Sequence, residues 1–141
     1  MILNIFTDGG ARGNPGPAGA GVVVKNEQGK VIFSKGFYIG KATNNIAEYQ
    51  GVMKAFEWLI DNREKINSVE KINFYLDSRL VASQLKGDFK IKAPHLAVLA
   101  INIKNKEKTF RCPINYFHIP REKNEEADAM VNKALDEKQK I

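Results

Sequence analysis

The sequence predicts an α/β protein in which helices flank a mixed five-stranded sheet. Segments typical of strands occur first in a run of three and then singly, between segments with the apolar period of helices. Gly, Pro and Asn separate these segments. A chain of 141 residues, 43% of them apolar, has the usual size of one domain. We therefore expect residues 1–141 to form a single domain, with a polar tail from about residue 136.

Three strands are expected in the first forty residues. Residues 2–7 are mostly apolar, and residues 19–25 and 31–39 are two further strand segments joined by a turn at residues 26–29. Segments joined by so short a turn pair in antiparallel fashion. The first three strands should therefore form an antiparallel meander.

The middle of the chain predicts a helix, a strand and a second helix. Residues 45–62 have apolar side chains at helical spacing, and Asn45 is available as the N-cap. Residues 72–76 alternate between apolar and polar side chains, which indicates a strand that ends at Asp77. Ser78 can cap a helix that continues through Leu85.

The last third of the chain predicts two helices and one more strand. Gly87 and Pro94 interrupt the chain, and the apolar residues of 96–103 then follow a helical period. Residues 114–119 form a strand that ends at Pro120. The final helix begins near Asn124, has acids in its first turn, and has an apolar stripe that extends to Leu135. The predicted order is therefore β-β-β-α-β-α-α-β-α.

Charge and cysteine content indicate which kind of partner and which cellular compartment to expect. The 22 Lys and Arg residues exceed the 16 Asp and Glu residues, and a net charge of +6 favours an anionic partner such as nucleic acid. Cys112 is the only cysteine, which excludes an internal disulfide and favours a reducing, cytoplasmic location. The apolar N-terminal run is short and soon meets Asp8, so we expect neither a signal peptide nor a membrane span.

Four acids occupy positions where burial of a charge is costly. Asp8 and Asp77 end two predicted strands, whereas Glu48 and Asp128 lie early in helices, at the border of the buried stripe. Each has a structural alternative. Asp8 can open a turn, Asp77 can cap a helix, Glu48 can form a capping box with Asn45, and Asp128 can interact with the helix dipole. A shared cation site accounts for all four acids together.

The donor set of such a site selects the cation and the chemistry. Carboxylates without Cys or His ligands suit Mg²⁺ or Mn²⁺. Two divalent ions about 3.5 to 4 Å apart would balance four carboxylates, one ion activating a water molecule and the other stabilising a leaving oxygen. The reaction expected of this arrangement is phosphodiester hydrolysis.

Four motifs together resemble the type 1 ribonuclease H family. They are TDGGARGNPGP at residues 7–17, TNNIAEY at 43–49, LDS at 76–78, and His118 followed by NEEAD at 124–128. The match runs from Ile2 to about Leu135 in the order and spacing of the family. The resemblance implies a ribonuclease H-like fold and Mg²⁺-dependent endonucleolytic cleavage of the RNA strand of RNA/DNA hybrids, with Mn²⁺ as a substitute ion. The products would carry 5′-phosphate and 3′-hydroxyl ends.

The resemblance also assigns roles to individual residues. Asp8, Glu48, Asp77 and Asp128 match the metal-binding, catalytic carboxylates. His118 matches a histidine that assists proton transfer or product departure. Arg121, on the same short segment, is an alternative for that task. An ordinary structural role for His118 at the end of the sheet stays open.

Recognition of a hybrid requires contacts to both strands. By resemblance, the RNA strand would meet Gly9, Gly10, Ala11, Asn14 and Asn44, and the DNA strand would meet Lys41, Thr43 and Asn45. Helix capping is the structural alternative for Thr43 and the two asparagines. Arg79 stands where several relatives have a glutamine that touches the minor groove, so RNA contacts there differ. The basic protrusion of some members is reduced or absent here, which predicts weaker and more salt-sensitive binding.

Two other functions fit the same residues. One is a module that binds RNA/DNA hybrids without cutting them, and the other is a different two-metal nuclease on the same fold. The four intact acids argue against the first, and the Gly and Asn positions around the RNA strand argue against the second. We expect a monomer whose partner is RNA/DNA hybrid, with double-stranded RNA as an open possibility and no membrane partner.

Overall fold

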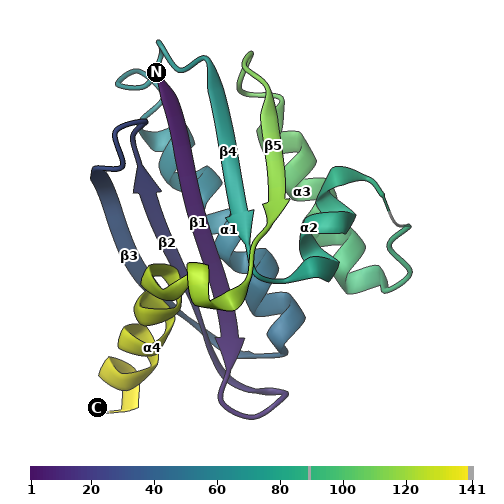
Figure 1. Cartoon of the computed structure of the whole chain (residues 1–141). Coiled ribbons are helices and arrows are strands. Elements are labelled where there is room, and N and C mark those ends of the chain that lie inside the picture. The colour runs from purple at the N-terminus through teal and green to yellow at the C-terminus, as the bar shows by residue number, and fades with distance from the viewer. Residues whose placement is uncertain (89, 140–141) are drawn as a thin grey trace.

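The elements of the computed structural model, which describes residues 1–88 and 90–139, follow the predicted order (Figure 1). They are β1 (Ile2–Ala11), β2 (Gly16–Lys25), β3 (Val31–Ala42), α1 (Asn44–Asp61), β4 (Lys71–Leu76), α2 (Arg79–Lys86), α3 (Pro94–Glu107), β5 (Ile114–His118) and α4 (Glu125–Gln139), with a 3-10 turn, η1 (Arg121–Lys123), before α4. No helix among the described residues is both long and apolar enough to cross a membrane.

The five strands form one mixed sheet in the order β3-β2-β1-β4-β5. β1, β2 and β3 pair antiparallel, as expected, whereas β4 pairs parallel to both β1 and β5. The turn between β2 and β3 is closed by Asn26, whose Oδ1 accepts hydrogen bonds from the backbone N–H groups of Gln28 and Lys30. The central strand β1 therefore has one antiparallel and one parallel neighbour.

Helices cover both faces of the sheet (Figure 1). A Cβ added at Gly9 of β1 would lie 2.1 Å from the backbone of Ala47 in α1. On the other face, a Cβ at Gly21 of β2 would lie 2.2 Å from the carbonyl oxygen of Ala127 in α4. The glycines of β1 and β2 thus allow two helices to pack directly on the strand backbones.

The main core lies between the sheet and α1. Leu3, Ile5 and Phe74 of the central strands and Phe56 of α1 are completely buried, and the rings of Phe56 and Phe74 stack with their centroids 5.0 Å apart. Burial of each such side chain contributes about 1.5 to 3 kcal/mol. This packing fixes β1, β4 and α1 relative to one another.

Two predicted boundaries around Asp8 are wrong. β1 does not end at Asp8 but continues to Ala11, and β2 begins at Gly16 rather than Gly19. The glycines that suggested a loop pair across the strands instead, with Gly10 opposite Gly19. Asp8 nevertheless lies at a real boundary, because the parallel pairing of β1 with β4 stops one residue before it.

The predicted cap of α2 is right, whereas for α1 the choice of Asn45 is wrong and the capping alternative for Thr43 is confirmed. The Ser78 side chain accepts a hydrogen bond from the backbone N–H of Val81, so it caps α2 and Asp77 is not needed there. The N-cap of α1 is Thr43 rather than Asn45, since the Thr43 hydroxyl accepts from the backbone N–H of Ile46 at 3.2 Å.

The C-terminal helix is longer than its apolar pattern indicates. The predicted polar tail begins at about residue 136, but α4 continues to Gln139, and residues 140 and 141 lie outside the described part of the chain. The side chains of Asp136 and Gln139 in its last turns contact Arg12.

Candidate active site

Three of the four predicted acids converge at one end of the central strands. The ligand oxygens of Asp8, Glu48 and Asp77 all lie within 4.8 Å of one another. Asp8 belongs to β1, Asp77 directly follows β4, and Glu48 lies in the second turn of α1. Three separate elements therefore contribute one carboxylate each.

The strand geometry explains how Asp8 and Asp77 meet. The last parallel pair of β1 and β4 is Thr7 with Leu76, so both acids leave the same edge of the sheet side by side. Glu48 reaches them because α1 lies unusually close to β1. An added Cβ would be 2.1 Å from the Ala47 backbone at Gly9 and 2.7 Å from the Asp8 carbonyl at Gly51. Two missing side chains thus allow the close approach.

Burial and mutual repulsion raise the pKa values of two of these acids. Burial, and then the nearby Asp77 carboxylate, raise the pKa of Asp8 to about 7. Burial and the charges of Asp8 and Asp77 raise the pKa of Glu48 well above its usual range. The Gly9 backbone N–H lowers both pKa values and offsets the shift only in part. The group of three acids is therefore stabilised when it binds a proton or another cation.

The described residues supply no cation of their own to this cluster. None of the ion pairs within residues 1–88 and 90–139 includes Asp8, Glu48 or Asp77. The buried Oε2 of Glu48 has no hydrogen-bond partner there. An unpaired, buried carboxylate oxygen beside two other acids is costly unless a cation joins them.

The fourth acid, Asp128, lines the same cavity as the other three. A cavity of about 530 Å³ is lined by all four acids, but Asp128 is outside the group whose oxygens lie within 4.8 Å of one another. Its Oδ2 accepts a hydrogen bond from Asn132 Nδ2 at 3.3 Å. The structure therefore brings three predicted metal ligands together and places the fourth at the same cavity.

The predicted substrate-binding residues divide into two groups. Gly9, Gly10, Ala11 and Asn44 line the cavity. The residues predicted to bind substrate that do not line it are Asn14, Lys41, Thr43, Asn45 and Arg79.

Asn44 links the cavity to the turn between β1 and β2. Asn44 Oδ1 accepts a hydrogen bond from the backbone N–H of Ala11 at 2.9 Å, and the Asn44 N–H donates to Asn14 Oδ1 at 3.0 Å. These contacts hold the start of α1 against the end of β1. Asn14 thereby supports a residue of the cavity although it does not line it.

Of the two alternatives on the segment after β5, Arg121 lies at the cavity and His118 does not. His118 is the exposed last residue of β5, where its backbone pairs with Leu76. Arg121 opens η1, three residues after the end of β5, and lines the same cavity as Asp77 and Asp128. A catalytic role for His118 stays a prediction.

Three residues of the site were not singled out by the sequence reasoning. Asn124, only 1% exposed, donates from Nδ2 to the Thr7 carbonyl at 2.9 Å and to Asp77 Oδ2 at 3.4 Å. Arg12 and Asn132 also line the cavity. The spacing of Asn132 four residues after Asp128 was a usable signal, because such residues are neighbours on a helix. Nothing in the sequence pattern indicates the contacts of Arg12.

The sheet order and the position of the acids define the class of protein. A mixed sheet in the order β3-β2-β1-β4-β5, with carboxylates where the two central parallel strands end, is the ribonuclease H-like fold. Residues 6–134 match the family described as reverse transcriptase-like. The chain belongs to this family and, within it, to the type 1 ribonucleases H.

Solved structures of relatives superpose on nearly the whole chain. Ribonuclease H1 isolated from compost by a metagenomic approach is 40% identical, with a TM-score of 0.92 and 98% of both chains covered. The same protein in complex with RNA/DNA hybrid gives 39% identity and a TM-score of 0.91, covering 97% of this chain and 99% of that one. Ribonuclease H1 of Halobacterium salinarum is 35% identical, with a TM-score of 0.88 over 97% and 99% of the two chains.

Curated relatives extend beyond the matched region. The bifunctional protein Rv2228c of Mycobacterium tuberculosis is 39% identical over 137 residues, which are 96% of this chain and 36% of that protein. Ribonuclease HI of Halobacterium salinarum is 36% identical over 135 residues, which are 96% of this chain and 65% of that protein. The chain therefore spans less than two thirds of these relatives.

Proposed function

We propose that the chain is a metal-dependent endonuclease that hydrolyses the RNA strand of RNA/DNA hybrids and leaves 5′-phosphate and 3′-hydroxyl ends. The observation that carries this proposal is the convergence of Asp8, Glu48 and Asp77 at a cavity of about 530 Å³. The compost ribonuclease H1, which shares this fold, has been crystallised in complex with RNA/DNA hybrid. Hybrid is accordingly the proposed substrate, and double-stranded RNA is a further candidate.

The residues present fit a hard divalent cation. The donors are all carboxylate oxygens, which suit Mg²⁺ or Mn²⁺. The raised pKa values of Asp8 and Glu48 and the unpartnered Glu48 Oε2 are the features expected of carboxylates that share a cation. Asp8, Glu48 and Asp77 would hold one ion, and Asp128, which lines the same cavity, would contribute a carboxylate to a second. Bound there, two such ions would supply Lewis-acid activation of water and stabilisation of the leaving oxygen.

The residues of the chain itself would bind and orient the substrate. Gly9, Gly10 and Ala11 present backbone without large side chains at the cavity, so a sugar and its phosphate can approach closely. Asn44, which already holds the Ala11 N–H, fixes that backbone in place. Arg121 would offer its guanidinium to a phosphate oxygen at the rim. Contacts of Lys41, Thr43, Asn45 and Arg79 would lie further along the duplex, outside the cavity.

The proposed state of the protein is a cytoplasmic monomer. All four acids come from one chain, so the site is complete without a second subunit. Cys112 is the single cysteine, which suits a reducing compartment.

Cleavage of defined duplexes tests the proposal. End-labelled RNA/DNA hybrid, RNA duplex and DNA duplex are incubated with protein in Mg²⁺, in Mn²⁺ and with chelator. We expect metal-dependent cutting of the RNA strand of the hybrid, and loss of cutting with retained hybrid binding in Asp77→Asn. Folded protein that binds hybrid but cuts nothing in either metal would instead be a binding module. Cutting of the DNA duplex would indicate a different two-metal nuclease.

A further inference from the structure

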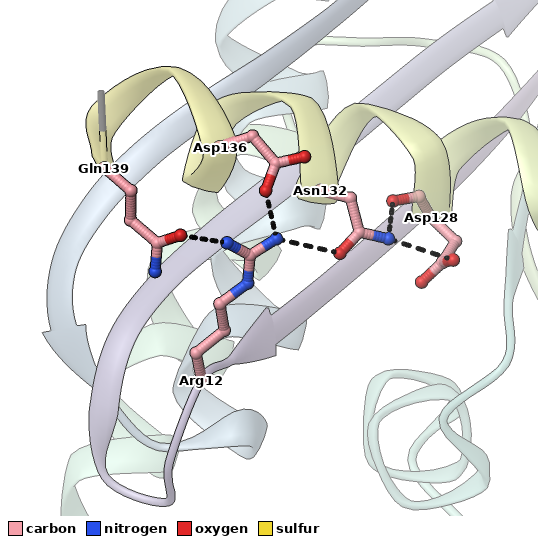
Figure 2. Close-up of polar contacts among 5 residues, drawn as sticks. All are labelled: Arg12, Asp128, Asn132, Asp136 and Gln139. Carbon is pink, nitrogen blue, oxygen red and sulfur yellow. Dashed lines mark hydrogen bonds and ion pairs between the residues drawn. The ribbon is translucent and has the colours of Figure 1, made fainter.

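The guanidinium of Arg12 connects the turn between β1 and β2 to α4 (Figure 2). Arg12 Nη2 lies 2.6 Å from Asp136 Oδ1, and Nη1 donates to Gln139 Oε1 at 2.7 Å. Nη2 also donates to Asn132 Oδ1 at 3.5 Å, the longest of the three contacts. The planar, five-donor fork of arginine can reach three acceptors on one helix, which a lysine ammonium on its flexible stem does poorly.

Asn132 extends this connection to the fourth acid. Its Nδ2 donates to Asp128 Oδ2 at 3.3 Å and to the Asp128 carbonyl oxygen at 3.2 Å (Figure 2). The two ends of the amide are therefore used differently. The acceptor oxygen faces the cation of Arg12, and the donor nitrogen faces the carboxylate of Asp128. Opposite charges on either side fix the orientation of this amide.

The four helix residues involved share one face of α4. Positions 128, 132, 136 and 139 are three or four residues apart, so their side chains lie in a row along the helix. Figure 2 shows the row facing the end of β1, with Asp128 at one end and Gln139 at the other. Arg12 contacts Asp136 and Gln139, at the end of the row that is distant from Asp128.

We propose that Arg12, acting through Asn132, is a positioning residue for Asp128 in the metal-dependent cleavage. This inference rests on the function proposed above. Asp128 is outside the group of three acids whose oxygens lie within 4.8 Å of one another. Its carboxylate is oriented by the hydrogen bond from Asn132 Nδ2. The link from Arg12 to Asn132 to Asp128 holds the carboxylate toward the cavity that all three residues line.

A competing role for Arg12 is direct binding of a substrate phosphate, because its side chain is 34% exposed at the cavity. The two roles have different kinetic signatures. A phosphate contact supports substrate binding, so its loss raises KM and lowers the salt dependence of binding. A positioning contact acts on the reacting geometry, so its loss lowers kcat and leaves KM unchanged.

Three variants and one control separate these roles. Asn132→Ala removes the bridge but leaves Arg12 bound to Asp136, and Arg12→Gln removes the cation. Lys133→Ala is the matched control, because the side chain of this exposed neighbour on α4 takes part in none of the hydrogen bonds found among residues 1–88 and 90–139. We expect kcat on RNA/DNA hybrid to fall about tenfold in both bridge variants, since small displacements of a reacting group are costly. The double variant should be no worse than the poorer single variant, because both changes break one link.

A measurement without substrate tests the link from Asn132 to Asp128 independently of whether the protein cleaves RNA/DNA hybrid. The ¹³C chemical shift of the Asp128 carboxyl carbon is followed by NMR in wild type, Asn132→Ala and Lys133→Ala. We expect this shift to change in Asn132→Ala and to match wild type in Lys133→Ala, with a folded spectrum in each case. If wild type cuts no hybrid, the proposed function fails while this readout still tests the link.

Three results would overturn the inference while wild type cleaves hybrid normally. The first is an unchanged kcat in Asn132→Ala, and the second is multiplication of the two single effects in the double variant. The third is a raised KM with unchanged kcat in Arg12→Gln, which would assign Arg12 to a substrate phosphate.

Discussion

The two sides of the cavity are held in place by different means. Asp8, Glu48 and Asp77 stand on β1, α1 and β4, whose positions are fixed by strand pairing, a buried core and close helix packing at Gly9. Asp128 stands on α4, which also packs closely on a strand, at Gly21 of β2, but the Asp128 side chain itself is oriented by a hydrogen bond from the exposed Asn132. Ligands set by backbone geometry are rigid, whereas a ligand set by surface contacts is adjustable. The comparison predicts that changes on the two sides have unequal effects.

The largest expected difference concerns catalysis. Asp8→Asn should lower kcat on RNA/DNA hybrid by about a thousandfold or more, because it removes a ligand from the compact group of three. Asp128→Asn should cost only about ten- to a hundredfold, because Asp128 lies outside that group. Single-turnover cleavage at saturating Mg²⁺ measures both variants. Equal losses would remove the distinction between the two sides.

The packing of Gly9 predicts the next largest effect, on folding. Gly9→Ala should lower the free energy of unfolding by about 3 kcal/mol or more, because the new methyl group would meet the α1 backbone. Gly10→Ala is the control, since its added Cβ would meet its nearest neighbour, Val131, only at 3.9 Å. Urea unfolding of both variants gives the comparison. A Gly9→Ala variant as stable as wild type would show that α1 can move away from β1.

The smallest of the three effects is a pH dependence of the metal-free protein. In the folded state Asp8 keeps its proton up to a pKa of about 7, whereas its ordinary value is 3.8. Between these values the folded state binds more protons than the unfolded state, so stability falls as pH rises. We expect a loss on the order of 2 kcal/mol between pH 5 and pH 8 with chelator. Asp8→Asn should flatten this slope, and a steeper slope in the variant would contradict the account.

Much of the fold follows from patterns that are local in sequence. The helical period over α1 and the alternation in β4 predict both elements, and Ser78 predicts the start of α2. The ends of β1 and β2 could not be predicted, because a run of glycines reads as a loop. Here Gly9 and Gly21 serve helices that approach from opposite faces, which is a tertiary effect.

The candidate site also has features that the sequence predicts and features that only the folded chain shows. The three clustered acids were predictable because each is an acid on the border of a buried element, a position that charge alone disfavours. The place of His118 away from the cavity could not be predicted, since it depends on the path of residues 119–124 rather than on periodicity. The contacts of Arg12 join residues more than a hundred positions apart, so only the folded chain brings them together.

Calorimetric titration of the folded, nucleic-acid-free protein with Mn²⁺ tests the central claim most directly. The claim is that Asp8, Glu48 and Asp77 form one cation site. Because burial and like charges raise the pKa values of Asp8 and Glu48, binding at pH 7 should release protons, which two buffers of different ionisation enthalpy reveal. We predict binding with proton release in wild type and its loss in Glu48→Gln. No binding by wild type, or equal binding by both proteins, would contradict the account.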